Sequence, residues 1–313
     1  MYTLVLNYKK IHSNYVTSAM PYIGVIIDGA EDWIKAYNNS NKEKIKVPLF
    51  SDKEQAFYED MRSSIKIWDR SYSEVYQRLE ILYQKSEEYF SGKCKPIAKF
   101  LKLYDIYGAD IVDRVYCGNT ILCSDFVPQF SYGSEVGPQI EQLSAIGGKY
   151  ISLFRAKDPY EINRAMVFSC TDYGGFEKSP VGNAFSDRFV LFSILCQINF
   201  VLKCIDGFLL NATTTKLRFS YLMYYYVMRL LPEINQKLST NFQMDNKWVC
   251  DKFRNAMAHY KIGVSLQESE IITTDSFYGL TQKYYNSDFT TVKDSIIKNL
   301  SVLSEQLTVY LNL

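Results

Sequence analysis

The chain of 313 residues has only two histidines, His12 and His259, and its seven cysteines form no Cys-x-x-Cys pair. A zinc site needs closely spaced cysteine or histidine ligands, so we expect no metal cofactor. Cysteines that are odd in number and irregularly spaced are typical of reduced, mostly buried thiols. The start of the sequence lacks the basic and then apolar order of a signal peptide, which favours a cytoplasmic location.

Neither sign of charge is in excess, because 35 Lys and Arg are balanced by 34 Asp and Glu. A protein that coats nucleic acid usually carries a strong basic excess, so this function is disfavoured. A local cationic cleft is still compatible with the composition, since an enzyme that grips one RNA loop needs few phosphate contacts. The hydrophobic fraction of 47% can fill a sizeable core, and the length suits two domains.

One stretch, Phe189 to Leu210, is apolar and about long enough to cross a bilayer. Polar side chains recur inside it, however, and such groups are costly in lipid but tolerable where a helix exposes one edge to water. We therefore interpret it as the central helix of a soluble bundle, with no membrane contact. The polar residues are Gln197, Asn199, Lys203 and Asp206.

The first third of the chain gives mixed signals. Residues Tyr2–Tyr8 alternate loosely, as a strand does, and Tyr22–Ile27 is a short apolar run of the kind a buried strand would have. Ser51 is a candidate N-cap for one or two helices that extend to about Phe90, and Pro96 is suited to begin the next helix.

The middle of the chain, residues 97–139, is broken by glycines and prolines into short segments. After it, helices are expected over Gln139–Phe154, interrupted at Gly147-Gly148, and over Tyr160–Ser169. The stretch Asp172–Asn183 contains three glycines and a proline, which makes it the best candidate for a domain boundary. We therefore predict an N-terminal region over residues 1–180, mixed α/β or helical, for regulation or recognition.

From residue 181 to 313 the pattern predicts four helices around one core, so the expected fold class is mainly α. One of these helices contains Leu222–Met228, which is apolar all round and is therefore expected to lie at the centre or at a subunit interface. The expected helices are Asp187–Leu209, Thr213–Leu231 ended by Pro232, Met244–Lys261, and Thr290–Leu311.

The third of these helices carries the chemically most specific pattern. Four-residue steps place Asp251, Asn255 and His259 on one face, with Arg254 beside them. The opposite face, with residues such as Phe253 and Met257, is apolar and can dock on a core.

An arginine next to an asparagine, followed after four residues by a histidine late in an amphipathic helix, resembles the R-x-x-x-x-H signature of the HEPN superfamily. The resemblance covers about residues 185–313. It implies a helical bundle, metal-independent RNA cleavage, and a homodimer whose arginines and histidines meet in one cleft. The alternative interpretation is that Arg254 pairs with Asp251 and His259 ends a helix, as in any helical bundle.

These residue types suit RNA cleavage, because RNA carries its own nucleophile in the 2′-hydroxyl. Histidine ionises near neutral pH and can transfer protons, while the arginine fork can donate twice to phosphoryl oxygens. We therefore expect Arg254 and His259 to be catalytic. The expected supporting residues are Asn255 and Asp251, and weaker RNA-binding candidates are Lys252, Lys261 and Tyr260.

Cleavage benefits from two proton-transfer groups, but this helix offers one histidine. A two-fold axis beside Ala258 would double the set, so we expect a homodimer. The resulting hypothesis is an endoribonuclease of the toxin or antiviral-defence type, restrained by an inhibitor or antitoxin. The alternative is a catalytically silent helical module for dimerisation or partner binding.

Overall fold

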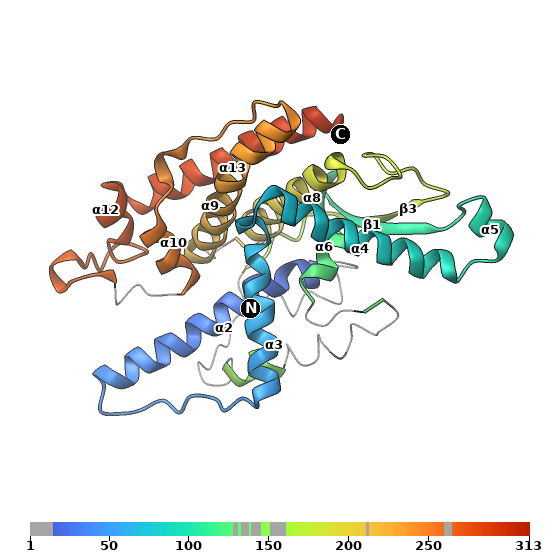
Figure 1. Cartoon of the computed structure of the whole chain (residues 1–313). Helices are drawn as coiled ribbons and strands as arrows, with labels where there is room; N and C mark the ends of the chain where they lie inside the picture. The colour runs from blue at the N-terminus through green and yellow to red at the C-terminus, as the bar shows by residue number, and fades with distance from the viewer. Residues whose placement is uncertain are drawn as a thin grey trace.

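The computed structural model of the chain describes residues 15–127, 131–132, 138, 145–150, 161–210, 213–259 and 265–313. Helices hold 65% of the residues and strands 8%, which confirms the predicted mainly α class. The strands form a single small sheet in this part of the chain, beside the helices (Figure 1). Residues 2–8, for which a strand is expected, lie outside the described residues.

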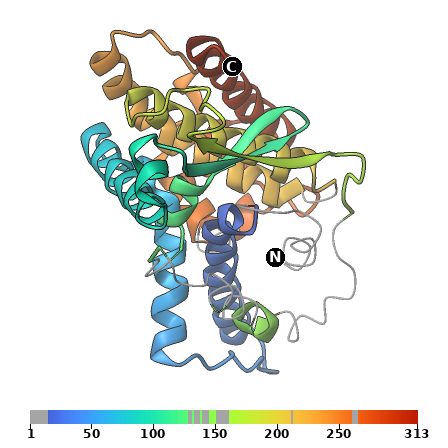
Figure 2. The same cartoon turned by 90° about the vertical axis from the view of Figure 1, so that its right-hand side faces the viewer.

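Two long helices open the described chain, α2 (Tyr15–Ser40) and α3 (Asp52–Ser63). They project together from the rest of the molecule (Figures 1 and 2). The apolar run Tyr22–Ile27 is part of α2 and not a strand. Its Ile23 lies on the same buried face of the helix as Ala19 before the run and Ile34 after it.

The boundaries of the next helices follow from local capping. Ser51 is the N-cap of α3, as predicted, and it forms a capping box with Glu54. Ser71 begins α4 (Tyr72–Gly92) in the same way with Glu74. A 3-10 helix, η1 (Ser64–Asp69), joins α3 to α4. Helix α5 (Pro96–Phe100) starts at its proline, which confirms that prediction.

The sheet has the order β2-β1-β3 and is antiparallel throughout. Its strands are β1 (Asp105–Val112), β2 (Val115–Asn119) and β3 (Phe168–Gly174). Helix α6 (Thr120–Asp125) follows β2 directly. The helix expected over Tyr160–Ser169 does not form in the described residues 161–169. Residues 161–167 form a turn and irregular chain with a bridge from Ile162 to Leu209, and Phe168 and Ser169 begin β3 and pair with β1. Of the helix expected over Gln139–Phe154, only residues 145–150 are described, and they are helical.

The C-terminal part begins with α8 (Asp187–Asn199), which continues as a π-helix, η2 (Phe200–Gly207). Helix α9 (Thr213–Leu238) follows, and α13 (Phe289–Leu311) closes the chain within one residue of its predicted start. Between them lie the 3-10 helices η3 (Asn246–Trp248) and η4 (Glu268–Glu270) and the short helices α10 (Asp251–Ala258) and α12 (Leu280–Tyr285).

Helix α9 runs through Pro232, so the predicted end there is wrong. Proline removes one backbone hydrogen bond, but the buried Leu230, Leu231 and Ile234 anchor the helix on both sides of it.

The helix expected over Met244–Lys261 is much shorter, since α10 covers only Asp251–Ala258. The hydroxyl of Tyr221 explains its late start. This hydroxyl lies 3.0 and 3.1 Å from the Trp248 and Cys250 carbonyls, which share its single proton, and it accepts from the Cys250 N–H at 3.1 Å. A side chain thus takes up backbone groups at this point.

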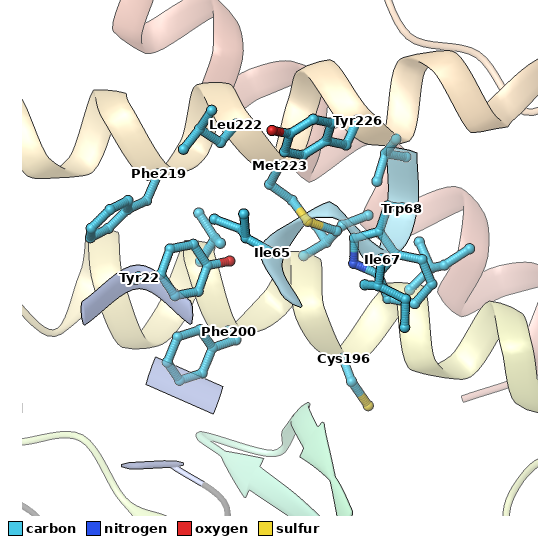
Figure 3. Close-up of a cluster of buried hydrophobic side chains, with 14 of the residues drawn as sticks. Tyr22, Ile65, Ile67, Trp68, Cys196, Phe200, Phe219, Leu222, Met223 and Tyr226 are labelled. Carbon is cyan, nitrogen blue, oxygen red and sulfur yellow. The ribbon is translucent and has the colours of Figure 1, made fainter. Parts of the chain in front are cut away.

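Figure 3 shows how the N-terminal helices enter the core. The Tyr22 ring of α2 stacks on Phe200 with centroids 5.8 Å apart and lies 4.6 Å from Phe219. Its buried hydroxyl accepts a hydrogen bond from Gln197 at 2.8 Å. Burial raises the pKa of Tyr22 far above its ordinary value. The apolar all-round stretch Leu222–Met228 faces this cluster and lies at the centre of the chain's own core.

One continuous core joins buried residues from both sides of residue 180. The candidate boundary Asp172–Asn183 begins inside β3, and its Asn183 side chain donates to the Gly174 carbonyl at 3.1 Å. The division of the chain into residues 1–180 and 181–313 stays a prediction. Limited proteolysis can test it, because the first cut should then fall within Asp172–Asn183.

Among the described residues, Asp187–Gly207 is the one helical stretch long and apolar enough to cross a membrane. Its most apolar part is 83% buried within the protein, where it packs on β2 and α13. This packing explains its composition, because a core helix needs the same apolar surface as a membrane span.

Candidate active site

Helix α10 docks on α9 and leaves its other face open. The side chains at Phe253, Ala256, Met257 and Ala258 are buried, whereas Asp251, Lys252 and Asn255 are exposed. Arg254 and His259 are partly buried. This arrangement confirms the predicted amphipathic pattern. Two of the weaker RNA-binding candidates, Tyr260 and Lys261, lie outside the described residues.

His259 is the residue that ends α10. It occupies the C-cap position, and its N–H donates to the Asn255 carbonyl at 3.0 Å. The alternative interpretation, that the histidine marks a helix end, is therefore correct as far as backbone position is concerned. Any chemical role of His259 depends on the contacts of its imidazole side chain.

The His259 side chain meets an ion pair supplied by the N-terminal helices. Nδ1 lies 3.4 Å from Nη1 of Arg62 in α3 and 3.6 Å from Oδ2 of Asp28 in α2. Arg62 and Asp28 themselves form a salt bridge of 2.8 Å. The three side chains remain 21–31% exposed, so solvent or a substrate can reach them. We call these three residues the His259 cluster.

A close approach of two helices places the charged groups of this cluster. A Cβ on Gly24 of α2 would lie 2.8–3.0 Å from the backbone and Cβ of Arg62, which is closer than atoms can pack. Gly24 is therefore required where α3 crosses α2. Asp28 follows Gly24 by four residues, so it lies one helical turn further along the same face and reaches the guanidinium of Arg62.

The charge of Asp28 is stabilised inside the cluster. Burial alone would raise the pKa of its carboxyl, but contact with His259 and the positive charge of Arg62 outweigh this effect and lower the pKa below the ordinary value of 3.8. Asp28 is therefore an anion at neutral pH. The Asp28 carboxylate favours the tautomer with its proton on Nδ1, whereas the Arg62 guanidinium, which can only donate, favours an unprotonated Nδ1. In the first tautomer Nε2 is free to accept a proton from a substrate.

Arg254 lies in a different environment, against the aromatic rings of α9. Its guanidinium carbon is 5.3 Å from the ring centre of Tyr225 and 6.0 Å from that of Tyr226. Its Nε is buried and has no hydrogen-bond partner among the described residues. The predicted alternative of an Arg254–Asp251 salt bridge is not among the ion pairs of this part of the chain.

Asp251 instead accepts a hydrogen bond of 2.5 Å from the hydroxyl of Tyr225. Arg229 donates to the same hydroxyl at 3.3 Å and pairs with Asp69 of η1 at 3.2 Å. Burial and the bond to Asp251 raise the pKa of Tyr225, against the effect of the nearby arginines. Asp251 thus supports the position of Arg254 through Tyr225.

A buried arginine holds the end of α10. Arg218 of α9 is 3% exposed and donates to the carbonyl of Ala256 at 3.3 Å and to that of Met257. A cation at the C-terminal end of a helix satisfies carbonyls that lack helical partners and interacts favourably with the helix dipole. Arg218 therefore fixes the turn from which His259 projects.

The sequence analysis missed Asp28, Arg62 and Arg218, because they lie outside the motif and meet it only in the folded chain. The spacing Gly24-x-x-x-Asp28 was the only local signal, and it is common in helices.

Within the described ranges, no group of three or more His, Cys, Asp or Glu side chains is arranged to hold a metal ion. The described cysteines form no disulfide bond with one another, and Cys117, Cys123, Cys196 and Cys204 are buried.

Comparisons with protein-family models, curated proteins and solved structures return no match for this chain. The resemblance to the HEPN superfamily therefore rests on the R-x-x-x-x-H sequence motif.

Proposed function

We propose that the chain is a metal-independent endoribonuclease of the HEPN type, acting in the cytoplasm as a toxin or antiviral-defence effector. The contact of His259 Nδ1 with Asp28 and Arg62 is the observation that carries the proposal. It places a partly exposed imidazole, an orienting carboxylate and a guanidinium within 3.6 Å of one another. Such a combination suits proton transfer next to a phosphate.

The reaction needs no external nucleophile. A base removes the proton of the RNA 2′-hydroxyl, its oxygen bonds to the adjacent phosphorus, and the bond to the 5′-oxygen breaks as that oxygen takes up a proton. The products are a 2′,3′-cyclic phosphate and a 5′-hydroxyl. His259 performs one of the two proton transfers through Nε2, and Asp28 holds the ring. Arg62 and Arg254 donate to the phosphoryl oxygens as negative charge develops.

The second proton transfer motivates the proposal of a homodimer, in which His259 of a second copy takes part. Ala258 is only 6% exposed within its own chain, so it cannot form the centre of the dimer interface. We place the interface along the exposed face of α10, with Asp251, Lys252 and Asn255. Light scattering at the assay concentration checks this. A fully active monomer overturns the composite site and leaves a single-copy nuclease.

The test of the nuclease compares His259→Ala with His12→Ala, which changes the only other histidine. We expect His259→Ala to lose about 100- to 10,000-fold in the rate of RNA cleavage, which is the usual contribution of general acid–base catalysis. The partly exposed side chain predicts little change in melting temperature. His12→Ala and treatment with EDTA should leave cleavage intact. Cleavage by His259→Ala at the wild-type rate contradicts the proposal.

The second candidate function is a silent helical module, and one observation favours it. Arg254 packs on two tyrosine rings, as a structural arginine does. Overexpression in a growing host separates the two functions. Growth arrest that needs both Arg254 and His259 supports the nuclease, and the same assay can detect an inhibitor or antitoxin that relieves the arrest. Arrest that ignores both residues, or no arrest, supports the module.

A further inference from the structure

A cavity of about 590 Å³ lies away from the His259 cluster, between the end of α4, strand β1, helix α6 and strand β3. Neither Arg254 nor any member of the His259 cluster lines it. Its size is in the range of sites for small molecules and single nucleotides. More of its lining is apolar than polar, yet carboxylates and a lysine also face it.

One wall of the cavity is aromatic. Tyr89 and Phe90 at the end of α4 meet edge to face with ring centres 5.1 Å apart, and Tyr132 lies 5.8 Å from Tyr89 and 6.5 Å from Phe90. Phe90 is 38% exposed, which is unusual for a ring that only fills a core. A wall of rings with an accessible edge offers stacking surface to a planar ligand.

Carboxylates lie at the cavity's sheet side. Asp172 of β3 lies opposite Gly108 of β1 in the sheet, and a Cβ on Gly108 would be 2.6 Å from Asp172 Oδ1. The absence of a side chain at Gly108 therefore makes room for this carboxylate. No described side chain or backbone N–H donates a hydrogen bond to Asp172. Asp105, at the start of β1, also lines the cavity.

A lysine lies beside the aromatic wall. Lys93 Nζ is 4.0 Å from the ring centre of Tyr89 and donates to its hydroxyl. Lys93 is exposed, so its charge is available to an anionic group outside the cavity. The cavity lining thus combines carboxylates, aromatic rings and a cation.

We propose that this cavity binds the guanine base of a nucleotide, with the ring on the aromatic wall and the phosphate of the nucleotide toward Lys93. A carboxylate only accepts hydrogen bonds at neutral pH, so a matching ligand must present donors side by side. Guanine presents its N1–H and 2-amino group on one edge, and both can bond to the two oxygens of Asp172. Adenine has a ring nitrogen acceptor at the corresponding position, which a carboxylate repels.

The base can come from a free nucleotide or from RNA, and two ligands separate these sources. Calorimetry on the full chain would use GMP and a short 2′-O-methyl oligonucleotide with one guanine among uridines, which cannot be cleaved through a 2′-hydroxyl. Binding of GMP assigns the cavity to a free nucleotide. Binding of the oligonucleotide alone assigns it to RNA. Binding of neither overturns the proposal.

Specificity is tested with AMP, or the same oligonucleotide with adenine, and with Asp172→Asn. We expect each change to weaken binding about tenfold to a hundredfold, as for the loss of a bidentate contact to a base. Asp172 is exposed on its strand, so the variant should fold. Gly108→Ala, which crowds the same carboxylate, should act in the same direction. Equal affinity for guanine and adenine, or wild-type affinity in Asp172→Asn, refutes the assignment.

This inference does not depend on the proposed nuclease. His259→Ala should bind guanine with wild-type affinity, so failure of one proposal leaves the other standing. If both hold, the cavity is a second contact for RNA or for a guanine nucleotide that regulates cleavage.

Discussion

The two residues of the motif on α10 lie in different environments. His259, at the C-terminal end, meets Asp28 and Arg62 from two N-terminal helices and is 31% exposed. Arg254, one and a half turns earlier, lies against Tyr225 and Tyr226 of α9, and its Nε is buried without a hydrogen-bond partner in the described chain. Charged groups surround the histidine, whereas aromatic rings surround the arginine.

The difference teaches that motif spacing does not fix the role of each residue. Two side chains five residues apart on a helix differ by more than a quarter turn and therefore face different neighbours. At the histidine, the neighbours supply an anion and a second guanidinium. At the arginine, they supply flat surfaces that restrain the side chain. Arg62 can therefore perform part of the phosphate contact that the motif assigns to Arg254 alone.

Among the variants that probe this difference, the two arginines, changed one at a time to glutamine, are expected to show the largest effect. We expect RNA cleavage to fall about 100-fold in each variant, because each removes a charged donor to the transition state. Only Arg62→Gln should also alter the pH dependence of cleavage, since it leaves Asp28 beside His259 without its cationic partner. Single-turnover rates between pH 5 and 9 measure both effects. A full-rate Arg62→Gln variant would restrict phosphate binding to Arg254.

Asp28→Asn should reduce cleavage about tenfold to a hundredfold, as expected when the group that orients a histidine is lost. It also has a stability signature. The pKa of Asp28 is lowered in the folded chain, so its stabilising contribution is complete above the ordinary value of 3.8 and is lost as pH falls below it. Urea unfolding should therefore show a deficit for Asp28→Asn at pH 6 that shrinks at pH 3. An equal deficit at both pH values would show that the carboxylate charge is not stabilised in the fold.

The smallest expected effect concerns the surroundings of Arg254, where the adjacent Tyr225 and Tyr226 can each be changed to phenylalanine and compared. Tyr225→Phe removes a hydroxyl that bonds to Asp251 and Arg229, and should lower the free energy of unfolding by about 1 kcal/mol. Tyr226→Phe removes a buried hydroxyl with no hydrogen-bond partner among the described residues, and should be neutral or stabilising. Both should keep cleavage within about twofold. A larger loss of cleavage in Tyr225→Phe would show that the support of Arg254 matters for catalysis.

Elements with local signals were predictable from the sequence. Ser51 with Glu54 specifies the start of α3, Pro96 that of α5, and a periodic apolar stripe the whole of α13. The amphipathic pattern of α10 was also visible, with its buried Phe253 and Met257. These features depend on residues within a few positions of one another, and such interactions act in any context.

Other features were decided by distant contacts. Strand β3 takes up the last two residues of the expected helix, Phe168 and Ser169, because β1 offers them backbone partners. Helix α9 passes Pro232 because buried neighbours hold it on both sides. Helix α10 starts late because Tyr221 takes up the backbone groups before it. In each case tertiary packing overrides a local preference worth only a few kcal/mol.

By itself, the sequence determined the mainly α class, the amphipathic α10, and the presence of an arginine and a histidine five residues apart on it. Only the tertiary structure decided what these two side chains meet. Gly24 lets α3 approach α2, which pairs Arg62 with Asp28 and brings both to His259, almost 200 residues further along the chain. No local pattern encodes such a meeting, because it depends on how three helices pack.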